Sequence, residues 1–131
     1  MFDWKKPTAQ MLGRWQPWHD GHIELFKRAL QKTGQVCIMY RDVAGVDAGV
    51  EGQGDNPFDF EDVKENIIKG LSEHGYEEGK EYIVINVPNI IDISYGRGVG
   101  YSFTEHDLGE EIHKISATKI RKDMRIKGKL K

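Results

Sequence analysis

Three short apolar runs, separated by two segments of helix length, constrain this chain more than any other feature. The runs cover residues 8–12, 35–40 and 82–87, and turn-forming or polar residues bound them. The run 35–40 is apolar enough to be a strand that is buried on both faces. Strands that alternate with helices favour βαβ units on a parallel sheet. The sequence therefore predicts a single α/β domain.

The two intervening segments carry apolar residues at helical spacing. The first helix is expected to begin at residue 22 and the second to end near residue 75; their apolar faces consist of Ile23, Phe26, Ala29 and Leu30, and of Phe60, Val63, Ile67 and Leu71. Gly34 stands where a glycine commonly closes a helix. Residues 90–94 are a candidate fourth strand, residues 116–125 are expected to form a short basic helix, and residues 1–7 are expected to be poorly ordered.

Composition narrows the class of protein. The chain has 131 residues and one cysteine, Cys37, so it can form neither an internal disulfide nor a cysteine-cluster zinc site. No run approaches the ~18 apolar residues of a membrane helix, and residues 1–6 lead into no signal-peptide core, so we expect a cytoplasmic protein. Residues 1–113 carry a net charge of −9 and residues 114–131 carry +7. This asymmetry suggests a polyanionic partner.

The turn between the first strand and the first helix is the first candidate site. It would lie at the carboxyl edge of the sheet, where ligands of open α/β folds bind. The helix start would offer unpaired backbone N–H groups to a phosphate. His19 and His22, three residues apart, can project to the same side and donate hydrogen bonds to phosphate oxygens. Gly13 and Gly21 would let the backbone approach a ligand closely.

A plainer interpretation of this turn is also open. A single histidine at a helix start is usually an ordinary polar residue, and Trp15 and Trp18 could be packing residues. A zinc site is not favoured, because the sequence has no HExxH motif and no third ligand at a recognisable spacing, so we expect no protein metal ligand.

A second candidate site lies near the C-terminus. Ser116 is a suitable N-cap, Thr118 falls in the first helical turn, and Arg121 follows one turn later, where its guanidinium can bind phosphate oxygens with two donors. Taken alone, the segment is more simply interpreted as a capped surface helix with solvated charges.

Four segments resemble a known family. Residues 13–22, Gly-Arg-Trp-Gln-Pro-Trp-His-Asp-Gly-His, resemble the His-x-Gly-His loop of the nucleotidyltransferase superfamily and are most similar to archaeal-type nicotinamide mononucleotide adenylyltransferases. Residues 115–121, Ile-Ser-Ala-Thr-Lys-Ile-Arg, resemble its Ile-Ser-x-Thr-x-Ile-Arg motif. Asn-Pro-Phe at 56–58 and Val-Pro-Asn-Ile at 87–90 are weaker matches. The resemblance implies a Rossmann-like three-layer sandwich with a mostly parallel sheet.

The resemblance also implies transfer of an adenylyl group from ATP to a small phosphorylated acceptor, with release of pyrophosphate. His19, His22 and Arg121 would be the catalytic residues. The implied nucleotide-binding residues are Gly13, Arg14, Trp15, Gly21, Ile115, Ser116 and Thr118, and the candidate acceptor-binding residues are Arg41, Asn89 and Arg97. Mg²⁺ would accompany the nucleoside triphosphate.

Other functions stay open at this level. The acceptor is not fixed, and nicotinamide mononucleotide is one candidate. A cytidylyltransferase that uses CTP and a glycerol-3-phosphate-like acceptor is the second enzymatic hypothesis, although the Gly-Arg-Trp-Gln sequence of the loop favours ATP. A non-catalytic nucleotide-binding module, or a nucleic-acid-binding module that uses the basic tail, is the alternative from another class; the tail has no interleaved aromatic residues, which disfavours nucleic acid. A homo-oligomer is compatible with all of these.

Overall fold

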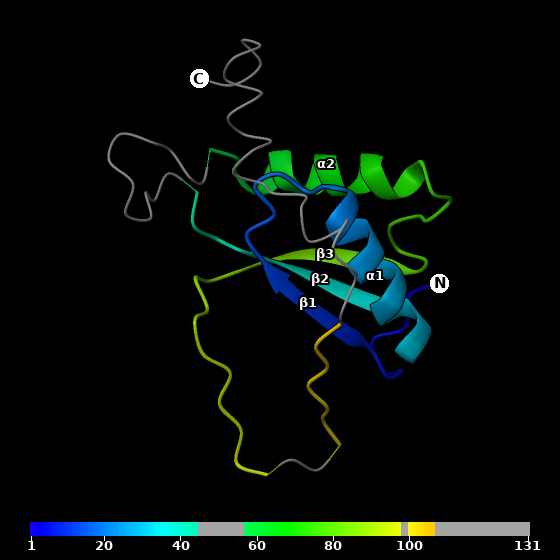
Figure 1. The fold of residues 1–131 in the computed structure, drawn as a ribbon, viewed down its shortest axis with the longest axis vertical. Helices are drawn as coiled ribbons and strands as arrows, with labels where there is room; N and C mark the ends of the chain where they lie inside the picture. Colours follow the sequence, from blue (N-terminus) through cyan, green and yellow to red (C-terminus); the bar gives the residue numbers. More distant parts are fainter. Residues whose placement is uncertain (45–56, 98–99, 107–131) are drawn as a thin grey trace.

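The strands and helices occur in the predicted order. A computed structural model describes residues 1–44, 57–97 and 100–106. The elements are β1 (Ala9–Gly13), α1 (Asp20–Thr33), β2 (Val36–Arg41), α2 (Phe60–Ser72) and β3 (Tyr82–Val87). The strands are all parallel and lie side by side in the order β1-β2-β3 (Figure 1). This sheet and its helices confirm the α/β prediction and are consistent with a Rossmann-like fold.

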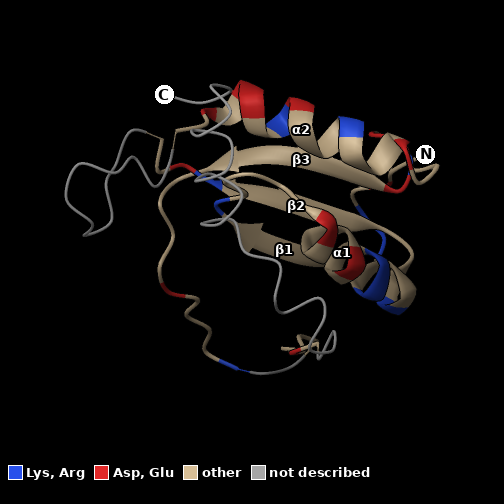
Figure 2. Cartoon of the chain, turned by 45° about the horizontal axis from the view of Figure 1, so that its top comes forward, with Lys and Arg blue, Asp and Glu red and all other residues tan. Residues whose placement is uncertain are grey.

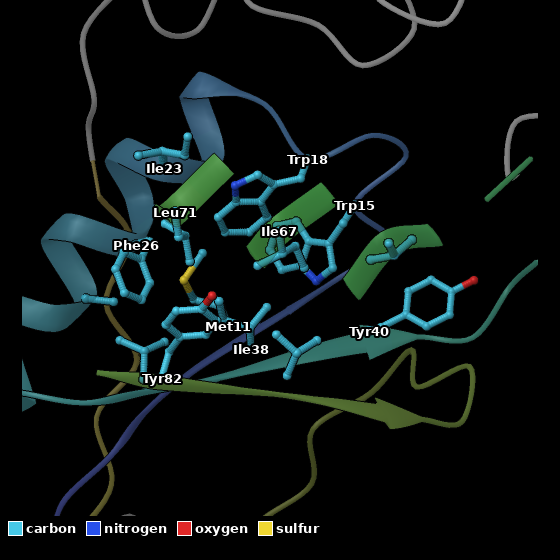
Figure 3. Close-up of a cluster of buried hydrophobic side chains, with 14 residues drawn as sticks. Met11, Trp15, Trp18, Ile23, Phe26, Ile38, Tyr40, Ile67, Leu71 and Tyr82 are labelled. Atoms are coloured by element: carbon cyan, nitrogen blue, oxygen red, sulfur yellow. The ribbon is translucent and has the colours of Figure 1, made fainter. Parts of the chain in front are cut away.

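Both helices lie on the same face of the sheet (Figure 3). Strands in sequential order make each crossover step in the same direction, and right-handed crossovers then place both helices on one side. Met11, Ile38 and Val84 share one row of the register and are buried in the cluster that the helices cover. The described elements therefore form two layers, one of helices and one sheet; the second helical layer of the expected three-layer sandwich is absent from the described residues.

The prediction that the run 35–40 is buried on both faces is wrong at Met39. Val36, Ile38 and Tyr40 are fully buried under the helices, and Cys37 on the other face is 9% exposed, whereas Met39 is only half-buried. Met39 is less buried because both described helices cover the other face of the sheet, the one that carries Val36, Ile38 and Tyr40.

The helices form where their apolar residues meet the sheet. α1 begins at Asp20, two residues before the predicted start, because His19 serves as its N-cap; Gly34 closes it with a φ of 84°, as predicted. α1 carries acidic side chains near its start and basic ones near its end, as the helix dipole favours (Figure 2). The predicted apolar face of α2 is confirmed by complete burial of Val63, Ile67 and Leu71. Neither described helix has the length and apolar character needed to cross a membrane.

The predicted fourth strand at 90–94 is absent from the described residues. Ile91 and Ile93 are 85% and 52% exposed, and residues 88–97 run away from the sheet (Figure 1). A strand is stabilised by hydrogen bonds to a neighbouring strand and by burial of one face, and this segment has neither in the part of the chain described. Three isoleucines within residues 90–94 are thus not sufficient to form a strand at this position.

The prediction that residues 1–7 are poorly ordered is also wrong. Gln35, predicted as the first residue of the second strand, lies directly before β2. It is 5% exposed, and its side chain binds the N-terminal segment. Its amide nitrogen donates to the carbonyl of Asp3 at 2.6 Å and to the hydroxyl of Thr8 at 2.7 Å, and its oxygen accepts from the Asp3 amide at 3.1 Å. These contacts hold the N-terminal segment against the amino end of β2.

Candidate functional site

The turn between β1 and α1 is built around two buried tryptophans. Trp15 and Trp18 are 6% and 7% exposed, and their rings meet edge to face with centroids 5.1 Å apart. Both also contact the ring of His22, at centroid distances of 4.8 and 5.3 Å. The interpretation of both tryptophans as packing residues is therefore confirmed. Because the Trp15 side chain is committed to the core (Figure 3), any contact it makes with a nucleotide falls to its backbone.

Gly13 is required by the protein's own packing. A Cβ atom at this position would lie 2.8 Å from the Trp15 ring, which covers the glycine. Trp15 adopts a φ of 50°, and its indole N–H donates to the carbonyl of Met39 at 3.1 Å. The sequence predicts that Gly13 leaves room for a ligand; the structure shows instead that this space is occupied by Trp15.

His19 and His22 lie together at the start of α1, as predicted. Their rings stack with centroids 3.6 Å apart and an interplanar angle of 18°. The backbone N–H of His19 donates to Nδ1 of His22, and the N–H of Gly21 donates to Nδ1 of His19, each at 3.1 Å. Each ring is therefore oriented by a backbone hydrogen bond through Nδ1.

The two rings are neutral at pH 7. Burial, and then the neighbouring His19, lower the pKa of His22 to about 3. Burial also lowers the pKa of His19, opposed by the carboxylate of Asp20. A neutral imidazole that accepts at Nδ1 carries its proton on Nε2. The pair thus provides two adjacent Nε2–H donors at the N-terminus of a helix, which is suited to the oxygens of a phosphate group.

The prediction of unpaired backbone N–H groups at this helix start is wrong at two residues. The Gly21 amide donates to the His19 ring, and the His22 amide donates to the His19 carbonyl at 2.9 Å. These donors are satisfied within the cap, so the imidazoles are the better candidates for contact with an anion.

The candidate acceptor residues are placed differently from one another. Arg41 is the last residue of β2 and Asn89 follows β3 by two residues, so both belong to the carboxyl edge of the sheet, as does Arg14 after β1. One Nη of Arg41 donates to the carbonyl of Ile90 at 3.5 Å. Arg97 does not follow a strand, because the predicted strand at 90–94 is absent from the described residues; it is exposed on the segment that leaves the sheet.

The second candidate site falls outside the described residues. This applies to Ile115, Ser116, Thr118 and Arg121, and also to Asn56 of the Asn-Pro-Phe match. Among the described residues, no three His, Cys, Asp or Glu side chains are grouped so that they could hold a metal ion.

Gln16 is a site residue that the sequence prediction missed. It lies between the two tryptophans and is 2% exposed. Its amide nitrogen donates to the carbonyl of Phe58, and its oxygen accepts from the Phe58 amide, both at 2.9 Å. A buried amide needs such partners, so a glutamine among packing aromatic residues was the signal that could have identified it.

Comparison with known proteins supports the resemblance to nucleotidyltransferases at a coarse level. Over 83 residues, 63% of this chain, the sequence is 29% identical to the nicotinamide-nucleotide adenylyltransferase of Methanococcus aeolicus. The aligned stretch covers 42% of that protein, so the chain matches less than half of its length. No protein-family model and no solved structure matches. The alignment supports a distant relationship to nucleotidyltransferases.

Proposed function

We propose that this chain is a nucleotidyltransferase that transfers the adenylyl group of ATP to a small phosphorylated acceptor, with nicotinamide mononucleotide as the first candidate. The observation that carries the proposal is the stacked His19–His22 pair, with both Nδ1 atoms bound to backbone N–H groups at the carboxyl edge of a parallel sheet. The distant similarity to an adenylyltransferase supports the same reaction class.

The reaction needs positioning and charge stabilisation more than covalent help. An oxygen of the acceptor phosphate forms a bond to the α-phosphorus of ATP, and the bond from that phosphorus to the α–β bridging oxygen breaks. Pyrophosphate leaves with the electron pair. The Nε2–H groups of His19 and His22 would donate to phosphate oxygens on which negative charge increases. A nearby anion also raises the pKa of an imidazole, so charge development strengthens these bonds.

The remaining roles follow the sequence prediction. Arg14 lies in the same turn, and Arg121, Ser116 and Thr118 would complete the triphosphate site, with Ile115 and the backbone of the 13–15 turn beside the base. Arg41 and Asn89 are the acceptor candidates at the sheet edge. Mg²⁺ would be held by the phosphate oxygens of ATP, because the described residues offer no carboxylate cluster. When bound, it neutralises phosphate charge.

Substitution of His22 tests this proposal. Pyrophosphate release from ATP and nicotinamide mononucleotide should fall by about 10²–10³ in His22→Asn, because one donor to the phosphates is lost. Asparagine keeps a side-chain oxygen near the Nδ1 position, so the helix cap is preserved. His74→Asn, at an exposed position beyond α2, is the matched control and should leave the rate unchanged. Wild-type turnover by folded His22→Asn would contradict the proposal. Turnover with CTP and glycerol-3-phosphate, but not with ATP, would support the cytidylyltransferase alternative instead.

A further inference from the structure

We infer that Gln16 is a positioning residue, whose amide clamps the histidine-bearing turn to the backbone of Phe58 and so fixes His19 and His22 for their ligand. The effect on turnover rests on the proposed function; the effect on the histidine rings does not.

The clamp joins two segments that are far apart in the sequence. The Gln16 amide group meets both the N–H and the C=O of Phe58, which is the geometry of a backbone bridge made by a side chain. The hydroxyl of Tyr40, on β2, donates to the same Phe58 carbonyl at 3.0 Å. The turn, the end of β2 and the start of α2 therefore share one hydrogen-bonded junction.

The clamp is transmitted to the histidines through the residues that flank Gln16. Trp15, directly before it, and Trp18, two residues after it, both contact the His22 ring. Trp18 also packs on α2 so closely that a Cβ at Gly70 would lie 3.1 Å from it. A loosened turn would let the tryptophans, and with them the imidazoles, leave the orientation that suits a phosphate. Small misplacements of positioned groups can cost large factors in rate.

Gln35 offers a matched control. It is the other buried glutamine among the described residues, and it also binds backbone groups of a distant segment, at the amino end of β2. Loss of its hydrogen bonds should lower stability in the same way as loss of those of Gln16. It has no contact with the histidine-bearing turn among the bonds described, so it should leave the histidines unchanged.

The test compares Gln16→Met with Gln35→Met, since methionine keeps side-chain length and removes the amide. Gln16→Met should lower kcat about 10- to 100-fold at a temperature where the protein is folded, with a smaller change in KM for ATP. NMR titration should show the pKa of the His22 ring rising from about 3 by a unit or more as burial is lost. Gln35→Met should change neither quantity.

The remaining outcomes distinguish failure of the positioning role of Gln16 from failure of the proposed function. Wild-type kcat and titration in folded Gln16→Met, or equal losses in Gln35→Met, would overturn the positioning role. An inactive wild-type protein in which Gln16→Met still moves the titration would contradict the proposed function and support the clamp. If Gln16→Met does not fold, Gln16→Asn keeps an amide that is one methylene too short to reach both the N–H and the C=O of Phe58; a reduced kcat supports the clamp, and an unchanged kcat overturns it.

Discussion

Two segments leave the carboxyl edge of the same sheet and behave in opposite ways. The 14–19 turn after β1 buries two tryptophans and Gln16, whereas residues 88–97 after β3 leave Ile91 and Tyr95 more than half exposed. Both segments are rich in large apolar side chains. The difference is that the first packs against α2 and β2 and the second has no such surface in the described part of the chain. A site that must hold donors in fixed positions is built on the packed turn.

The largest loss of stability is expected from a substitution in the core of that turn. Trp15→Ala removes an indole that contacts Trp18 and His22 and donates to Met39, so it should lower the free energy of unfolding by about 3–5 kcal/mol. Urea denaturation measures this change. A loss under 1 kcal/mol would show that the packing of Trp15 does little to stabilise the turn.

Acidification should weaken the same turn. The unfolded chain protonates His22 below pH 6.5, whereas the folded protein resists protonation down to about pH 3, so stability is complete above pH 6.5 and falls as the pH drops. We expect about 2–3 kcal/mol of this loss by pH 4, after allowance for partial exposure. His22→Asn should lack this component. Parallel denaturation curves for both proteins from pH 7 to pH 4 give the difference, and identical pH dependence would contradict a neutral, buried His22.

A smaller effect is expected at Gly13. Gly13→Ala places a methyl group against the Trp15 ring, and such overpacking should lower the free energy of unfolding by about 1–3 kcal/mol. Gly96→Ala is the matched control, because nothing lies within 4 Å of a Cβ there. Thermal unfolding should show a lower midpoint for Gly13→Ala than for Gly96→Ala. Equal midpoints would mean that Gly13 is no more tightly packed than Gly96.

The smallest effect is expected on the extended segment itself. Ile91→Ser exchanges an 85% exposed side chain and should change stability by less than about 0.5 kcal/mol. A loss above 2 kcal/mol would mean that Ile91 is buried in solution and that the segment packs on a surface.

The sequence predicted the features that depend on local spacing. The apolar faces around Phe26 and Ile67, the cap at Gly34 and the pairing of His19 with His22 all follow from helical periodicity. Each of these needs only neighbours within a few residues.

The features that sequence reasoning missed depend on contacts between distant segments. Gln16 finds its partners 42 residues away at Phe58, and Gln35 finds one 32 residues away at Asp3. Periodicity within a segment says nothing about such partners, nor about whether a strand-like run such as 90–94 has a neighbour. It also did not show that Trp15 fills the space beside Gly13.

The fate of the α-phosphate of ATP distinguishes adenylyl transfer from other reactions of the nucleotide. The wild-type protein is incubated with Mg²⁺, nicotinamide mononucleotide and ATP labelled at either the α- or the γ-phosphate, and the products are separated. We expect α-label in a dinucleotide and γ-label in pyrophosphate, with both reduced about 10²–10³-fold in His22→Asn. Transfer of the γ-label to the acceptor, or α-label transfer that is undiminished in folded His22→Asn, would exclude adenylyl transfer assisted by the histidine pair.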